Sequence, residues 1–152
     1  MEKFSQITDY LFVGGQPRPN DVDTLKSLDI KLIISMAGNI WPPGIFRKPP
    51  FQLLWLRTFD TIFTPIPMKK LLKGVETALP VIENGERVLA HCAFGRHRGV
   101  VMGSAILIAK GYSADDAMKL ISEKRAVADP YAWYIERRIR KFERIWRQRT
   151  GD

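Results

Sequence analysis

Residues 87–111 read RVLAHCAFGRHRGVVMGSAILIAKG, and three kinds of sequence follow one another in them. RVLAH (87–91) is a short apolar run typical of a buried strand. CAFGRHR (92–98) is a polar loop around a glycine, and GVVMGSAILIAKG (99–111) is an apolar stretch long enough for a buried helix that ends at its last glycine. The stretch therefore predicts a strand, a tight loop and a helix, a unit typical of α/β domains.

The flanking sequence is consistent with the same class of fold. Further strands are expected at four apolar runs: FSQI (4–7), YLFVGG (10–15), IKLIISMA (30–37) and FQLLWLRT (51–58). Further helices are expected over NDVDTLKSLD (20–29), MKKLLKGVETALPVIENG (68–85), SADDAMKLISEKR (113–125) and a basic segment (131–149). Strands that alternate with helices predict a single α/β domain over residues 1–152, with a mainly parallel central sheet flanked by helices.

Local signals refine the ends of these elements. Asn20 and Ser113 are the first residues of predicted helical segments, where N-caps stand. Pro80 is expected to kink or shorten the helix that contains it, because proline removes a backbone donor. The Pro- and Gly-rich stretch 37–50 is expected to be loop, and Asp129 is expected to start the last helix.

Composition narrows the class of partner and the compartment. The chain has 152 residues, a formal net charge of +8 and a single cysteine. The charge favours anionic partners: phosphate esters, nucleic acid, acidic lipid surfaces or acidic peptides. One cysteine cannot form an internal disulfide, and the sequence shows neither a secretory leader nor an apolar run of transmembrane length. We therefore expect a cytoplasmic monomer in which Cys92 is a free thiol.

Several physical effects would act on Cys92 in the predicted loop. Ligands of open α/β folds bind beyond the carboxyl ends of strands, where this residue lies. Amides at a helix N-terminus favour a thiolate, and the backbone around Gly95 could turn into an anion-binding nest. Arg98 could bind two phosphate oxygens at once. A lone buried cysteine is most often an inert small hydrophobe, but a thiolate in a phosphate cradle suits covalent phosphoryl transfer.

HCAFGRHR (91–98) matches the His-Cys-x5-Arg signature of the cysteine-based protein tyrosine phosphatases. In its His-Cys-x-x-Gly-x-x-Arg form it resembles the small dual-specificity class. ITDYLFVGGQP (7–17) looks like the amino-terminal strand pair of that class, and KRAVADPYAWYIERRIRKFE (124–143) looks like its closing helices. The resemblance implies the dual-specificity phosphatase fold over most of the chain.

The resemblance also assigns roles to residues. Cys92 would attack phosphorus, and Asp60, in the loop FDTIFTPIP (59–67), would protonate the leaving oxygen and later activate water. His91 would tune the thiolate through backbone hydrogen bonds. Phosphate would be bound by the side chain of Arg98 and by the loop that contains Ala93, Phe94, Gly95, Arg96, His97 and Arg98. Neither a cofactor nor a metal is implied.

The sequence departs from that pattern at Gly99, where the family normally has Ser or Thr. That hydroxyl bonds the cysteine sulfur, so we expect slower breakdown of the phosphocysteine here. Arg96 and His97 add charge that suits a substrate with more than one phosphate or an acidic flank. In the family, the region of Asp129 can also help to order the site.

Several functions remain open at this level. The leading expectation is a phosphate monoester hydrolase acting on phosphotyrosine proteins, with or without phosphoserine and phosphothreonine. The alternatives are a lipid phosphatase, on phosphoinositide or phosphatidylglycerophosphate, an RNA 5′-phosphatase, a phospho-binding pseudophosphatase and a rhodanese-like sulfurtransferase. The basic last helix is expected to pack an apolar stripe on the core, and its alternative role is to meet an anionic membrane. That stripe contains Ile135, Ile139, Phe142 and Trp146.

Overall fold

A five-stranded sheet forms the centre of the computed structural model, which describes residues 2–151. Its strands are β1 (Phe4–Gln6), β2 (Leu11–Gly14), β3 (Ile30–Ala37), β4 (Gln52–Thr58) and β5 (Arg87–His91). The order across the sheet is β1-β2-β5-β3-β4. Only β1 is antiparallel to its neighbour, and the other three pairings are parallel. The predicted α/β fold with a mainly parallel sheet is confirmed.

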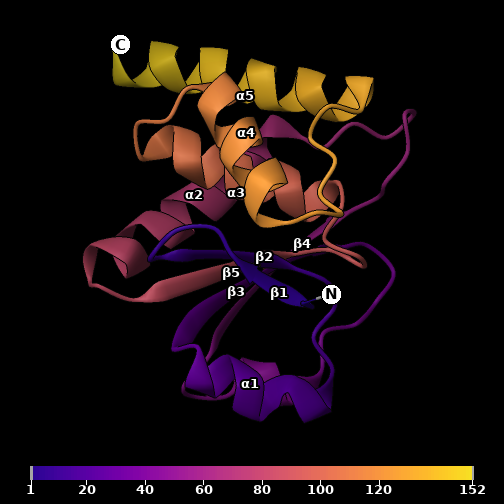
Figure 1. Ribbon diagram of the computed structural model, residues 1–152, viewed down its shortest axis with the longest axis vertical. Coiled ribbons are helices and arrows are strands. Elements are labelled where there is room, and N and C mark those ends of the chain that lie inside the picture. The colour runs from indigo at the N-terminus through magenta and orange to yellow at the C-terminus, as the bar shows by residue number, and fades with distance from the viewer. Residues whose placement is uncertain (1, 152) are drawn as a thin grey trace.

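Helices cover both faces of this sheet. They are α1 (Val22–Ser27), α2 (Met68–Glu83), α3 (Arg98–Ala109), α4 (Ala114–Lys124) and α5 (Trp133–Thr150). Two short 3₁₀ turns, Pro19–Asp21 and Gly44–Arg47, complete the assignment. Helix α1 lies alone on one face, while α2 to α5 lie on the other, with α5 as the outermost element (Figure 1).

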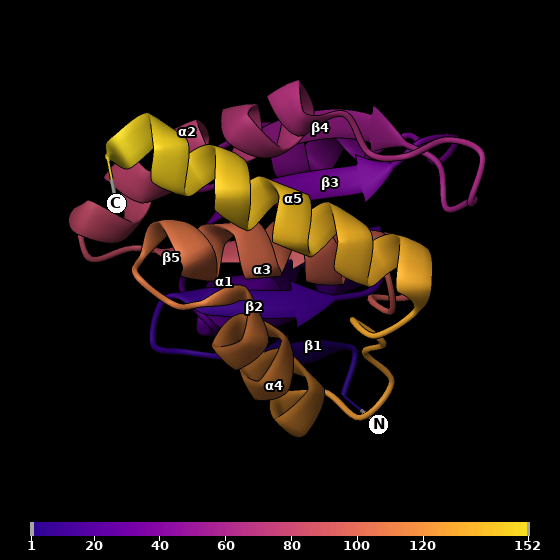
Figure 2. The same cartoon turned by 90° about the horizontal axis from the view of Figure 1, so that it is seen from above.

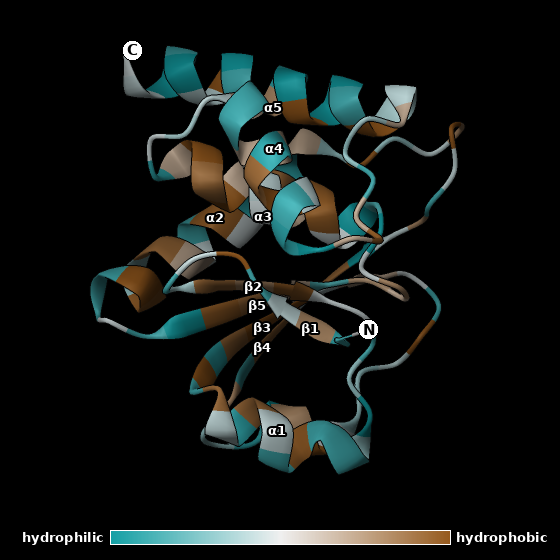
Figure 3. Ribbon diagram, in the orientation of Figure 1, coloured by the Kyte–Doolittle hydropathy of each residue, from teal (hydrophilic) through white to brown (hydrophobic). Residues whose placement is uncertain are grey.

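Helix α3, which follows the central strand β5, is almost wholly buried in the core. Eleven of its twelve residues are buried, because it is covered by the sheet on one side and by α2, α4 and α5 on the others. Figure 3 shows α3 as hydrophobic, whereas the outer surface of α5 is hydrophilic. A helix that is apolar all round is stable only in such a position.

The loops that follow the parallel strands gather at one edge of the sheet. Seen from above, β2, β3 and β4 point the same way, and the start of α5 lies over that edge (Figure 2). Arg98, at the start of α3, lies at this edge because β5 ends at His91. Within residues 2–151, no helix is long and apolar enough to cross a membrane.

Two local predictions were wrong and a third was wrong in part. Asn20 does not cap α1, because a 3₁₀ turn over Pro19–Asp21 precedes that helix. Pro80 does not shorten α2, which continues through it to Glu83, whereas a kink at Pro80 stays a prediction. Asp129 does not start α5, which begins at Trp133.

Other local predictions were correct. The Ser113 hydroxyl accepts a hydrogen bond from the Asp116 amide at 3.0 Å, as an N-cap does. Gly111 follows the end of α3 with a positive φ of 109°. The stretch 37–50 is mostly loop, with one 3₁₀ turn inside it.

Candidate active site

The loop of residues 92–97 turns its carbonyl groups outward. The carbonyl of Ala93 accepts a hydrogen bond from the Gln16 amide, that of Arg96 from the Asp129 amide, and that of His97 from the Val101 amide. The Phe94 and Gly95 carbonyls are also bonded, as described below. In contrast, the amides of residues 93–97 donate to no group within residues 2–151. A loop with satisfied carbonyls and free amides can form an anion-binding nest.

Arg125 supplies the missing bonds to the loop and was not predicted as a site residue. Its guanidinium, 4% exposed, donates to the carbonyls of Phe94 and Gly95 at 3.0 and 2.9 Å. It also donates to the Ser5 hydroxyl in β1 at 2.9 Å. Burial lowers the pKa of Arg125, and the nearby Cys92 charge opposes that effect. The only sequence signal for this residue is its place in the segment 124–143 that resembles the family's closing helices.

Gly95 permits the turn as predicted. Its φ is +65°, which favours glycine, and a Cβ there would lie 2.6 Å from the carbonyl carbon and oxygen of Gly14. Gly99 is also closely packed, because a Cβ at that position would lie 3.2 Å from the Cys92 amide nitrogen. The two glycines therefore let the loop and α3 approach the ends of β2 and β5.

Arg98 is buried and only partly satisfied. Its Nη1 donates to the carbonyls of Met36 and Thr58, at the ends of β3 and β4, at 3.2 and 2.8 Å. Its Nε is buried and has no hydrogen-bond partner within residues 2–151. A buried unsatisfied guanidinium donor costs free energy unless a ligand accepts its hydrogen. The two carbonyls thus orient the guanidinium and leave its Nε without a partner.

Cys92 lies directly after β5 and is 4% exposed. The neighbouring His91 is buried, and its Nδ1 lies 3.3 Å from the Cys92 carbonyl oxygen. Burial lowers the pKa of His91 to about 4, so its ring is neutral at pH 7 and can donate this hydrogen bond. The role of His91 in tuning the thiolate stays a prediction, but the backbone contact on which it depends is present.

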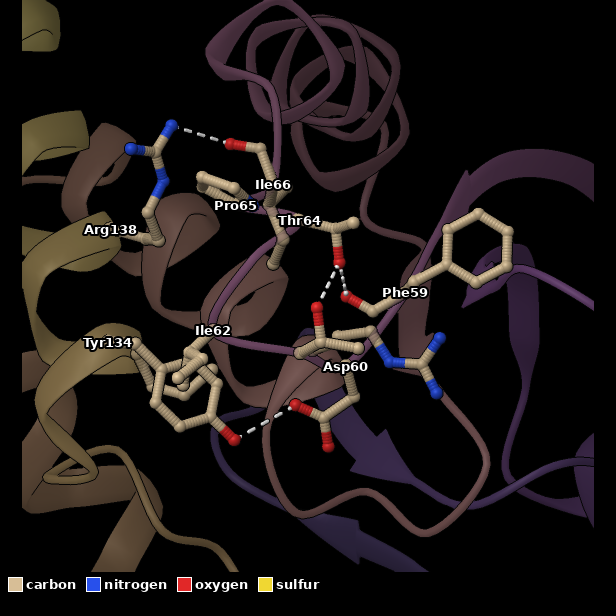
Figure 4. A pocket seen from close by; sticks show the side chains of 11 residues that line it. Phe59, Asp60, Ile62, Thr64, Pro65, Ile66, Tyr134 and Arg138 are labelled. Carbon is tan, nitrogen blue, oxygen red and sulfur yellow. Dashed lines mark hydrogen bonds between the residues drawn. The ribbon is translucent and has the colours of Figure 1, made fainter.

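The predicted acid Asp60 is brought to the same loop. Its carboxylate accepts a hydrogen bond from His97 Nδ1 at 2.9 Å. It accepts another from the Tyr134 hydroxyl, on α5, at 3.1 Å (Figure 4). Burial and the Asp60 charge raise the pKa of Tyr134. A small pocket beside Asp60 is lined by residues 59–62 and 64–66, by α5 and by Arg98. The sequence did not predict Tyr134 as part of the site.

Exposed apolar side chains surround this edge of the molecule. Every large apolar side chain that is exposed among residues 2–151 lies in the loops after β3, β4 and β5 or just before and at the start of α5. This apolar rim consists of Trp41, Ile45, Phe59, Ile62, Phe63, Phe94, Tyr131 and Trp133. In contrast, the apolar stripe on α5 packs against the core, since its residues Ile135, Ile139 and Phe142 are buried.

Comparison with known proteins gives a consistent result, although no family model matches the chain. The chain is 28% identical over 127 residues to protein-tyrosine-phosphatase MKP1 of Arabidopsis thaliana, an alignment that covers 83% of this chain but 16% of that protein. It is 28% identical over 143 residues to dual specificity protein phosphatase 1B of the same plant, covering 92% of this chain and 81% of the relative.

A solved structure, PTPMT1 in complex with PI(5)P, has a TM-score of 0.86 at 23% identity, with 98% of this chain and 99% of that chain covered. The fold is therefore that of the small dual-specificity phosphatases.

Proposed function

We propose that this chain, a homologue of the cysteine-based tyrosine and dual-specificity phosphatases, hydrolyses phosphate monoesters through a phosphocysteine intermediate. The observation that carries the proposal is that two groups of hydrogen-bond donors without partners lie in the same loop and helix start as one thiol. The amides of residues 93–97 and the Nε of Arg98 make no hydrogen bond within the described chain. Cys92 lies at the start of that loop. A phosphate group supplies the acceptors that these donors lack.

The first step forms a bond between sulfur and phosphorus. The Cys92 thiolate attacks phosphorus while the ester bond to the leaving oxygen breaks. The loop amides and Arg98 stabilise the charge that builds on the other phosphate oxygens. Asp60 gives a proton to the leaving oxygen, which would otherwise depart as a high-energy anion.

The second step returns the enzyme to its starting state. Water attacks phosphorus, Asp60 takes its proton, and the bond between phosphorus and sulfur breaks. Gly99 provides no hydroxyl to stabilise the departing thiolate, so this step is expected to limit turnover. We also propose that the chain is a monomer and lies in the cytoplasm. A reducing compartment of that kind keeps Cys92 as a thiol.

Phosphate release over a matched panel tests the proposal. The panel contains phosphotyrosine and phosphothreonine peptides, phosphoinositides, phosphatidylglycerophosphate and a 5′-triphosphate RNA, each with the parent and with Cys92→Ser. Release by the parent and not by the variant is expected. Release that is equal in both proteins would contradict the proposal. Phosphopeptide binding without release would favour the pseudophosphatase alternative.

The apolar rim favours a second candidate, a lipid phosphate presented at an anionic membrane. Phe63 is 85% and Phe94 79% exposed, and both lie at the edge that carries the candidate site. Apolar and aromatic side chains beside basic residues are typical of proteins that bind membrane surfaces. Sedimentation with anionic and neutral vesicles separates this candidate from the leading one. Binding to the anionic vesicles that is lost in Phe63→Ser would support a lipid substrate, and no binding at physiological salt would exclude it.

A further inference from the structure

His97 lies between two carboxylates from different parts of the chain. Its Nδ1 is 2.9 Å from Asp60 Oδ2, and its Nε2 is 3.6 Å from Asp129 Oδ2. The first carboxylate belongs to the loop after β4, and the second to the segment between α4 and α5. The His97 side chain is 14% exposed, so water replaces these contacts poorly. His97 therefore links the candidate phosphate-binding loop to the loop that carries the acid.

The geometry favours a ring with protons on both nitrogens. A neutral ring with its proton on Nδ1 would turn the Nε2 lone pair toward the Asp129 carboxylate. The Nε2 is buried and makes no hydrogen bond within residues 2–151, so no other donor relieves that contact. An imidazolium presents one N–H to each carboxylate instead. Imidazole is also the side chain that changes charge near neutral pH.

Among residues 2–151, the charged or titratable groups in contact with this ring come from three parts of the chain. Asp60 approaches from the loop after β4, Asp129 from the segment before α5, and the Tyr134 hydroxyl from α5, 3.3 Å from Nδ1. Arg96, on the same loop as His97, lies 3.8 Å from Asp129 and competes for that carboxylate. The Tyr134 hydroxyl donates to Asp60 Oδ1, which leaves Oδ2 to His97.

We propose that His97 is a positioning residue that holds Asp60 over the site and carries the proton that Asp60 delivers to the leaving oxygen. This inference rests on the proposed phosphatase function. A lone aspartic acid has an ordinary pKa of about 3.9 and is almost wholly ionised at pH 7. A histidine whose Nδ1–H donates to that carboxylate can supply the proton that a lone aspartate lacks at neutral pH.

The proton balance closes without a further reactant. In the first step the proton moves from His97 Nδ1 to the Asp60 carboxylate and then to the leaving oxygen as the ester bond breaks. The ring is then neutral and Asp60 is ionised. In the second step the proton lost by the attacking water passes through Asp60 back to His97 Nδ1. The pair therefore gives one proton and regains one in each turnover.

The test compares kcat/KM, which reports the step that forms the phosphocysteine, between pH 5 and 9 for the parent and His97→Asn, with a phenyl phosphate whose leaving group is poor. Asparagine keeps a donor near the Nδ1 position but cannot carry a proton. We expect kcat/KM to fall by roughly a hundredfold or more at pH 7 and by about tenfold near pH 5, as the ordinary pKa values of Asp and His imply. A matched control, Asp116→Asn on the exposed first turn of α4, should follow the parent. Profiles of equal shape for the parent and His97→Asn would overturn the proposal.

A second measurement does not depend on activity. The chain has two histidines, so few ring N–H signals need to be distinguished in NMR spectra. The Nδ1 proton of His97, which donates to Asp60, should exchange slowly with water in the parent and faster in Asp60→Ala. An unchanged exchange rate would overturn the proposal even if phosphatase activity is present. Faster exchange in Asp60→Ala, in a protein without Cys92-dependent activity, would retain the pairing and refute the proposed function instead.

Discussion

Acid should destabilise this protein through one buried side chain, His91. The ring is 1% exposed, and its pKa is lowered from 6.5 to about 4, first by burial and then by the charges of Arg98 and Lys3. The hydrogen bond to the Cys92 carbonyl opposes these effects without cancelling them. Below pH 6.5 the unfolded chain therefore binds a proton at this histidine that the folded chain does not bind.

The size of the effect follows from the two pKa values. One pKa unit corresponds to about 1.4 kcal/mol. The free energy of unfolding should therefore be unaffected above pH 6.5, fall by about 2 kcal/mol at pH 5 and by about 3 kcal/mol at pH 4. This loss is a large fraction of the roughly 5–15 kcal/mol that stabilises a typical domain.

Urea denaturation at pH 7, 5.5 and 4.5 measures the effect, with His91→Asn as the matched control. The variant removes the titrating ring and keeps a donor near the Nδ1 position, although its smaller side chain lowers stability at every pH. Other acid-sensitive groups contribute alike to both proteins, so the difference between their pH slopes isolates His91. Parallel pH dependence of the two proteins would refute the reasoning.

Further substitutions test the loop. Gly95→Ala should abolish activity, because its Cβ would lie 2.6 Å from the Gly14 backbone. Gly85→Ala, with a similar φ of +78° and open space around it, should lower the free energy of unfolding by roughly 1–2 kcal/mol and retain activity. An equal loss of activity in both variants would contradict this. Arg125→Lys should lower kcat at least tenfold, because an ammonium cannot replace the guanidinium donors to the Phe94 and Gly95 carbonyls; an unchanged kcat would show that they are dispensable. Gly99→Ser should raise the steady-state rate that follows a product burst, and unchanged turnover would count against slow phosphocysteine breakdown.

The part of the site that is contiguous in the chain could be predicted from the sequence. Cys92, Gly95 and Arg98 share one strand–loop–helix unit, so their relative places follow from local structure. A mainly parallel sheet was likewise expected, because the strands are apolar runs joined by helical segments.

The parts that depend on tertiary contacts could not be predicted in the same way. Arg125 reaches the loop across 30 residues of sequence, and the Tyr134 hydroxyl reaches Asp60 across 74. Asp129 has the local signature of a helix start, yet its amide bonds to the Arg96 carbonyl and its carboxylate faces His97. Local capping preferences are worth only about 1 kcal/mol, so they do not by themselves decide where a helix begins.

Trapping the intermediate tests the central claim most directly. The parent is mixed with an aryl phosphate, quenched in acid within milliseconds and digested, and the peptide that contains Cys92 is examined by mass spectrometry. We predict one phosphate on Cys92 in the parent, none in Cys92→Ser, and phosphate release in the parent only. Phosphate release without a phosphorylated Cys92, or equal release by the two proteins, would contradict the account.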